Sequence, residues 1–166
     1  MNPHQLRIRP VLPRDNQKLA VVIRDVLIEF GVPEKGTALE DASLEQMYEA
    51  YQLPRSEYWV ISDASGIWGG GGIAPLEGAD RLVCELQKMY FSRELRGLGW
   101  GDRLIRRAQD KARSLGYRKI YLETMPYMTA AQNLYLRHGF QYLDRPRGHT
   151  GHVACTVWME KEIDQG

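Results

Sequence analysis

The sequence predicts an α/β (α+β) protein built on a mixed, mostly antiparallel sheet of about six or seven strands, with about four helices. Short segments with alternating or continuous apolar residues recur along the chain and are separated by turn residues, as strands are. Over residues 81–124 a strand, a helix and a second strand follow one another, and this order makes the two strands parallel. We expect a single domain over residues 1–166, because this length suits one hydrophobic core.

The first elements are a strand over residues 5–10, a helix, and a second short helix near 44–51. Asp15 is a candidate N-cap for the first helix, which runs to about Phe30. In the second helix, Tyr48 and Tyr51 would either line a substrate cleft or pack into the core. The first helix presents an apolar face made of Leu19, Val22, Ile23, Val26 and Leu27.

A hairpin follows, with strands over residues 57–62 and 67–76. The second strand contains four consecutive glycines, Gly69 to Gly72. Glycines weaken a strand, so they indicate a bulge, a close approach of a ligand, or a flat surface under a bulky neighbour such as Trp59. They do not form a phosphate loop, because no helix follows them.

The second half of the chain holds the strand–helix–strand unit and a further helix with two strands. We expect a strand over 81–91, a helix over 98–115 and a strand over 117–124. A helix over 128–138 and strands over 140–143 and 153–160 complete the fold.

Charge is unevenly distributed although the net charge is only +1. Residues 93–119 are rich in arginine and lysine, whereas residues 25–57 are rich in aspartate and glutamate. This asymmetry indicates one anionic ligand and one cationic ligand, or, for the acidic segment, simply a solvated helix face.

The remaining composition favours a reduced, cytoplasmic protein. Cys84 and Cys155 lack metal-ligand spacing, and we recognise no signal peptide or membrane span. His149 and His152 lie in a loop without a matching set of acids or thiols, so we expect no metal there. A substrate-contacting loop or an ordinary polar turn explains these histidines better.

The most informative stretch is Arg96-Gly97-Leu98-Gly99-Trp100-Gly101, between a strand and a helix. Glycines bring backbone N–H groups close to a ligand, and a helix N-terminus attracts anions, so this stretch predicts a phosphate cradle. It lacks the lysine and hydroxyl of a P-loop. Its glycine spacing is one residue short of the dinucleotide fingerprint, and the expected series of βα units does not follow.

This stretch resembles the R/Q-x-x-G-x-G/A signature of the GNAT superfamily of acetyl-CoA-dependent N-acetyltransferases. Downstream, Leu134-Tyr135 followed by Gly139-Phe140 is similar to the LYxxxGF segment of that family. The resemblance spans about residues 57–160 and implies transfer of an acetyl group from acetyl-CoA to a primary amine, by direct attack in a ternary complex. A non-catalytic acyl-CoA-binding module is the alternative.

The resemblance also implies which residues hold the cofactor. The CoA pyrophosphate would lie on the cradle, and the pantetheine arm would run along the preceding strand, where the Phe91 N–H would stabilise the oxyanion. Asparagine is common in the family seven residues before Tyr135, but this chain has Met128 there. The implied cofactor-binding residues are Met89, Tyr90, Phe91, Arg96, Gly97, Leu98, Gly99, Trp100, Gly101 and Asp102.

Three catalytic residues are implied. Glu85 and Glu123 match positions at which different branches of the family place the general base, and Glu85 is slightly favoured. Tyr135 would protonate the departing CoA thiolate. The acceptor is expected to be a small-molecule or peptide amine, since the acidic segment favours a cation. A nucleic-acid partner is disfavoured, no metal is expected, and a homodimer is compatible with the sequence.

Overall fold

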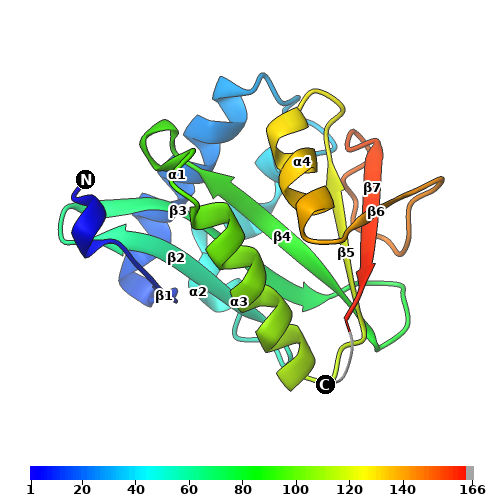
Figure 1. Cartoon of the computed structure of the whole chain (residues 1–166). Coiled ribbons are helices and arrows are strands. Elements are labelled where there is room, and N and C mark those ends of the chain that lie inside the picture. Colours follow the sequence, from blue (N-terminus) through cyan, green and yellow to red (C-terminus); the bar gives the residue numbers. More distant parts are fainter. Residues whose placement is uncertain (164–166) are drawn as a thin grey trace.

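The computed structural model describes residues 1–163 and consists of a seven-stranded sheet with helices on both faces (Figure 1). The strands lie in the order β1-β2-β3-β4-β5-β7-β6, and every neighbouring pair is antiparallel except β4 and β5. This arrangement confirms the predicted mixed, mostly antiparallel sheet with its parallel strand–helix–strand unit. The strands are β1 (Arg7–Pro10), β2 (Glu57–Asp63), β3 (Gly66–Pro75), β4 (Val83–Phe91), β5 (Lys119–Thr124), β6 (Gln141–Leu143) and β7 (Val157–Glu162).

Two helices cover each face of the sheet. On one face, α3 (Trp100–Ser114) and α4 (Thr129–Arg137) pack on a core that includes Trp59, Leu104 and Phe140. On the other face, α1 (Asn16–Glu29) and the short α2 (Met47–Ala50) cover a second core around Leu19, Tyr58 and Val60. The predicted apolar face of α1 is confirmed: Leu19, Ile23, Val26 and Leu27 are buried, and the fifth residue, Val22, is partly buried against the same core.

Asp15 stands at the N-cap position of α1, but it does not cap the helix. Its carboxylate instead accepts hydrogen bonds from the guanidinium of Arg9, at 2.6 and 3.0 Å, and from the Leu12 N–H at 2.8 Å. The buried carboxylate therefore ties β1 to the start of the helix. The predicted position was correct, whereas the predicted capping bond was wrong.

The last strand starts later than the sequence predicted. We expected it at residue 153, but β7 begins at Val157, opposite Thr124, the last residue of β5. Residues 153–156 lie beyond the end of β5 and have no strand to pair with. They form a turn in which the Ala154 N–H donates to the Gly36 carbonyl at 3.0 Å.

The second helix is also shorter than predicted. Residues 42–45 form a 3₁₀ turn and only Met47–Ala50 are α-helical. Of its two tyrosines, Tyr51 is buried and stacks at 5.0 Å on Tyr58, while Tyr48 is partly buried. No helix within residues 1–163 is long and apolar enough to span a membrane.

Candidate active site

The two central strands of the sheet separate partway along their length. Strands β4 and β5 are paired only at Val83–Lys119, Cys84–Ile120 and Glu85–Tyr121. Beyond Glu85, β4 therefore continues without a neighbour on that side. Parallel strands that part in this way leave backbone N–H and C=O groups without strand partners, and these groups become available to a ligand.

A β-bulge in β4 accompanies this separation. Gly70 pairs with Tyr90 but Gly72 pairs with Gln87, so two residues of β4, Lys88 and Met89, stand opposite Gly71 alone. Lys88 has a φ of 47°, a left-handed conformation that a non-glycine residue adopts at some cost. The bulge predicted at the glycine segment is confirmed, although the extra residue belongs to β4.

The glycines of β3 are needed because aromatic and apolar side chains cross them closely. A Cβ at Gly72 would lie 2.6 Å from the Tyr58 ring, and one at Gly71 would lie 2.8 Å from Leu104. Both distances are shorter than a normal contact, so the glycines leave room for the Tyr58 ring of the neighbouring strand β2 and for Leu104 of α3.

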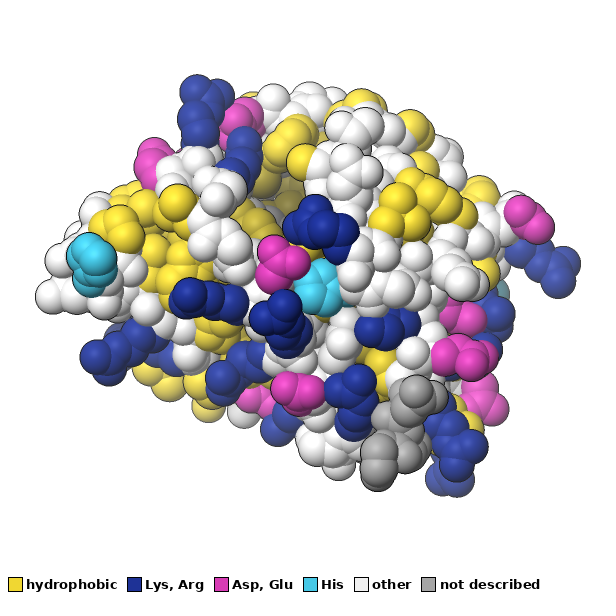
Figure 2. Space-filling model, viewed as in Figure 1, with side chains coloured by type: hydrophobic (Ala, Val, Ile, Leu, Met, Phe, Trp, Pro, Cys, Tyr) yellow, Lys and Arg dark blue, Asp and Glu magenta, His cyan; other side chains and the backbone are white. Residues whose placement is uncertain are grey.

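A cavity of about 700 Å³ occupies the gap between β4 and β5. It extends from the start of α3, past β4 and the N-terminal part of α4, to Glu85, Glu123 and His152. Figure 2 shows the face of the molecule that carries α3, where basic side chains surround a hollowed apolar area. A single cavity thus joins the predicted phosphate cradle to both predicted catalytic glutamates.

The cradle has the backbone conformation that its glycines suggested. Gly97 and Gly99 have φ values of 74° and 80°, and a Cβ at either position would meet nothing within 4 Å. Helix α3 starts at Trp100, and no side chain caps its N-terminus. The first N–H groups of a helix need an acceptor from outside the helix, so this end is suited to an anion.

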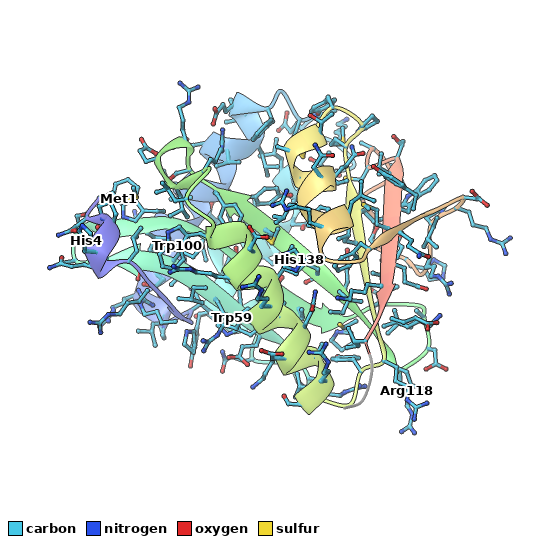
Figure 3. The ribbon with its side chains drawn as sticks, viewed as in Figure 1. Met1, His4, Trp59, Trp100, Arg118 and His138 are labelled. Atoms are coloured by element: carbon cyan, nitrogen blue, oxygen red, sulfur yellow. The ribbon has the colours of Figure 1, made fainter. Side chains whose placement is uncertain are left out.

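The other cradle residues play different parts. A Cβ at Gly101 would lie 2.6 Å from Leu134, so this glycine lets α3 and α4 approach each other. Trp100 is buried at the start of α3 under the guanidinium of Arg103, and Asp102 bonds His138, whose ring lies at the end of α4 (Figure 3). Leu98 is about half exposed and does not line the cavity.

Arg96 lines the cavity but its guanidinium has carboxylate and carbonyl partners. Its Nε donates to the Phe91 carbonyl at 2.9 Å, and Nη1 and Nη2 contact the two oxygens of Glu29 at 3.0 and 2.8 Å. Hydrogen bonds from Arg96 and Arg93 lower the pKa of Glu29 to about 2. Arg96 therefore fastens the end of α1 to the cradle.

The end of β4 directs one N–H group into the gap. The Ser92 N–H donates to the Trp68 carbonyl on β3 at 2.8 Å. Because neighbouring residues of an antiparallel strand face opposite sides, the N–H of Phe91 points away from β3, toward the space where β5 has diverged. The Arg96 bond to the Phe91 carbonyl lies on this same side.

Glu85, Glu123 and His152 meet at the inner end of the cavity. One ligand-type atom from each lies within 4.8 Å of the other two. Glu85 is only 7% exposed and accepts a hydrogen bond from the Gln87 amide at 2.7 Å, and Tyr51 donates to the oxygen of that amide at 2.6 Å. Burial, and secondly the charge of Glu123, raise the pKa of Glu85.

The Glu123 carboxylate is held by two hydroxyl groups. Tyr121 donates to one oxygen at 2.9 Å, and Thr150, from the loop before β7, bonds the other. The Tyr121 hydroxyl in turn accepts from the Arg147 N–H at 3.1 Å. The loop of residues 144–156 is thus fixed onto β5 at this point.

His152 is held by Asp41, an acid that is distant in the sequence. Its Nε2 lies 3.0 Å from Asp41, which also pairs with Lys88 at 2.8 Å. The hydrogen bond to Asp41 raises the pKa of His152. Burial would raise the pKa of Asp41, but its bonds to His152 and Lys88 lower it. The sequence left two interpretations open for His152, a substrate-contacting loop and an ordinary polar turn. In the structure His152 lies in a loop and lines the cavity.

Tyr135 lies on α4, lines the cavity and packs on Phe140, with ring centroids 5.8 Å apart. Burial raises the pKa of its hydroxyl, which therefore stays protonated at neutral pH. Met128 also lines the cavity, where the asparagine common in the family would stand, and its sulfur accepts from Thr124 at 3.6 Å.

The acidic segment is less available to a ligand than its charge suggested. Glu29 binds Arg93 and Arg96, Glu45 binds Arg24, and Glu57 binds Lys111. These carboxylates are already neutralised within the chain. The acids at the inner end of the cavity are instead Glu85 and Glu123, from the central strands.

Sequence reasoning missed most of the groups around the two glutamates. The alternation of a strand would have placed Gln87 beside Glu85, since residues two apart share a face. No such signal marks the other groups. Loops bring Asp41 and Thr150 to the site, and a strand bulge brings Lys88.

Comparison with known proteins agrees with this geometry. The profile of the Acetyltransferase (GNAT) family matches residues 24–140. The uncharacterised N-acetyltransferase YjgM of Escherichia coli is 40% identical over 97% of both chains, and one of Schizosaccharomyces pombe is 28% identical over 99% of both. An acetyltransferase of the GNAT family from Staphylococcus aureus shares the fold, with a TM-score of 0.85, 20% identity and coverage of 96% and 99% of the two chains.

The sheet opened between its central strands, with an uncapped helix N-terminus at one end of the gap, agrees with the class that these relatives define, the acetyl-CoA-dependent acetyltransferases. The family match spans more than half of the chain, so the chain belongs to the GNAT family. It is an acetyl-CoA-dependent N-acetyltransferase, as the sequence motifs indicated.

Proposed function

We propose that this enzyme transfers the acetyl group directly from acetyl-CoA to a primary amine while both are bound. The observation that carries the proposal is the single cavity that joins the α3 cradle, the Phe91 N–H side of β4 and the Glu85–Glu123 pair. A likeness of fold also supports the donor. A phosphinothricin acetyltransferase from Sinorhizobium meliloti, solved in complex with acetyl-CoA, has a TM-score of 0.76 at 16% identity, over 98% and 90% of the chains.

The donor would lie along the cavity from α3 toward Glu85. Its pyrophosphate would accept hydrogen bonds from the N–H groups of residues 97–102, where Gly97 and Gly99 leave open space. The pantetheine arm would follow β4 past Met89, Tyr90 and Phe91. We assign Leu98 no more than a backbone contact, because its side chain is outside the cavity lining.

Acetyl transfer needs an electrophile that is polarised and a nucleophile that has lost its proton. The amine nitrogen attacks the thioester carbonyl carbon, and the carbonyl oxygen becomes an oxyanion that accepts from the Phe91 N–H. Collapse of this intermediate breaks the C–S bond and releases CoA thiolate. Tyr135, which lines the cavity, donates a proton that converts the thiolate to a thiol, and the proton that the nitrogen loses as the intermediate collapses restores the Tyr135 hydroxyl.

Glu85 is the better candidate for the general base. An alkylammonium has a pKa of about 10.4, so the acceptor arrives mainly protonated. A carboxylate with a raised pKa takes that proton more readily at neutral pH. Glu85 is buried with a raised pKa, whereas Glu123 is fixed by two hydroxyl donors and would orient the ammonium.

The test is thiol release from acetyl-CoA in the presence of a panel of primary amines. We expect release that depends on both acetyl-CoA and amine, and mass spectrometry should show the acetylated amine. Acetyl-CoA binding without release for every amine, unchanged in Glu85→Gln and Tyr135→Phe, would overturn the proposal and favour a non-catalytic module.

A further inference from the structure

The basic side chains that line the cavity share one property within residues 1–163. Each of the four is paired with a carboxylate of the chain itself. Near the cradle, Arg96 pairs with Glu29 and Arg137 with Asp102. At the inner end, the pairs are Lys88–Asp41 and His152–Asp41.

The two carboxylates at the inner end have the opposite property. Glu85 accepts from the neutral amide of Gln87, and Glu123 accepts from the hydroxyls of Tyr121 and Thr150. Neither forms an ion pair with a cation of the chain within the described residues; His152 lies within 4.8 Å of both, but its Nε2 is bonded to Asp41. A buried carboxylate without an ionic partner is costly, and Glu85 is only 7% exposed, so this end of the cavity is complementary to a cation supplied by the ligand.

From this pairing pattern we infer that the acceptor is a compact primary alkylammonium with no carboxylate or phosphate close to its nitrogen. Asp41 determines this specificity, because it occupies the two cations, Lys88 and His152, that would otherwise bind an acidic group. The inference rests on the proposed function and narrows its substrate class.

The position of Asp41 explains why an amino acid would be a poor acceptor. The ammonium of a bound amino acid would lie between Glu85 and Glu123. The carboxylate of that amino acid would then lie near these two acids and near Asp41. The Lys88 side chain is only 8% exposed and its ammonium is 2.8 Å from Asp41, so binding another anion would require this ion pair to break. Like charges that are brought together without compensation weaken binding.

The first experiment compares three acceptors that have the same three-carbon chain on the amine: propylamine, β-alanine and β-alaninamide. We expect kcat/KM for propylamine to exceed that for β-alanine at least about tenfold, as one uncompensated charge contact would produce. β-Alaninamide, which has the same length without the charge, should recover most of the loss. Equal or better turnover of β-alanine would overturn the inference while the proposed function stands.

The second experiment changes Asp41. In Asp41→Asn, Lys88 and His152 lose their shared carboxylate, and the propylamine to β-alanine ratio of kcat/KM should fall about tenfold. Asp41→Glu, which keeps the charge, should keep the wild-type preference. A ratio that is unchanged in Asp41→Asn would overturn the role of Asp41. Absence of turnover with all three amines in the wild type would overturn the proposed function, and this inference with it.

Discussion

Among single residues, Glu85 is subject to two opposing demands. Its side chain is 7% exposed, and both burial and the nearby Glu123 raise its pKa. A raised pKa suits a base, but it also means that ionisation of Glu85 costs the folded protein stability. The same group should therefore help turnover and lower stability.

Replacing Glu85 by glutamine should lower kcat by about 10²- to 10⁴-fold, since general-base assistance is worth that much. The loss should be largest at low pH and shrink as the amine loses its own proton. The measurement is kcat against pH for wild type, Glu85→Gln and Glu123→Gln. A greater loss in Glu123→Gln would move the base to that residue.

The same Glu85→Gln change should raise the stability of the protein at neutral pH. When folding raises the pKa of an acid, ionisation of that acid lowers the stability of the protein. The loss develops as the pH rises from the unfolded pKa, about 4.3 for glutamate, through the folded pKa. Glutamine does not ionise, so the gain in melting temperature should be present at pH 8 and absent at pH 4. A gain that does not depend on pH would mean that packing, and not ionisation, causes it.

Among the elements, the N-terminus of α3 depends on the left-handed conformation of Gly99. Gly99→Ala should cost about 1–2 kcal/mol of stability, because a Cβ is strained at positive φ. It should also weaken acetyl-CoA binding, since the new methyl group enters the open cradle. Thermal unfolding and calorimetric titration measure the two effects.

Gly116 offers a matched control for this prediction. It follows the C-terminus of the same helix, has the same φ of 80°, and likewise has open space around its Cβ position. Gly116→Ala should lower stability to a similar extent and leave acetyl-CoA affinity unchanged. Equal affinity losses in both variants would place the cofactor elsewhere.

The sequence predicted the elements better than their ends. The apolar face of α1 and the strand–helix–strand unit are local patterns, and both are confirmed. The start of β7 was wrong because it depends on where β5 ends, which no local pattern around Val153 records. The bonding of Asp15 was wrong because Arg9, on a strand, competes for its carboxylate.

For the site, the motif residues were predictable and their neighbours were not. Gly97, Gly99 and Tyr135 belong to motifs, and the structure places all three along one cavity. Asp41 and Lys88 meet through a loop and a strand bulge, and their pairing arises only from the tertiary fold. Arg96 was predicted to be a cofactor-binding residue, and that stays a prediction; its ion pair with Glu29 was not predicted, because it depends on how α1 crosses the sheet.

At the scale of the whole molecule, Glu29 connects the first helix to the cofactor end of the cavity. Its carboxylate holds Arg93 and Arg96, and its pKa of about 2 keeps these ion pairs intact across the physiological pH range. An anionic cofactor would compete with this carboxylate for the same guanidinium groups.

Glu29→Gln should therefore strengthen acetyl-CoA binding, by about three- to tenfold, because charge-assisted bonds from Arg96 become available to phosphate. Calorimetric titration measures the affinity, and the gain should diminish at high salt. The control is Glu45→Gln. It removes the ion pair between Glu45 and Arg24 of α1, which lies away from the cradle. Weaker binding in Glu29→Gln would show that the carboxylate positions Arg96 for the cofactor.

The parting of β4 from β5 has a further consequence for how the protein exists in solution. Sheet edges usually lie at the rim of a molecule, where they can recruit strands from other chains. Here the part of β4 after Glu85 that has no β5 partner lies along the cavity, between α1 on one face and α3 and α4 on the other. A strand edge placed between two helical layers is less accessible to a strand of another copy than an edge at the rim, so depth, and not charge, protects this edge from aggregation.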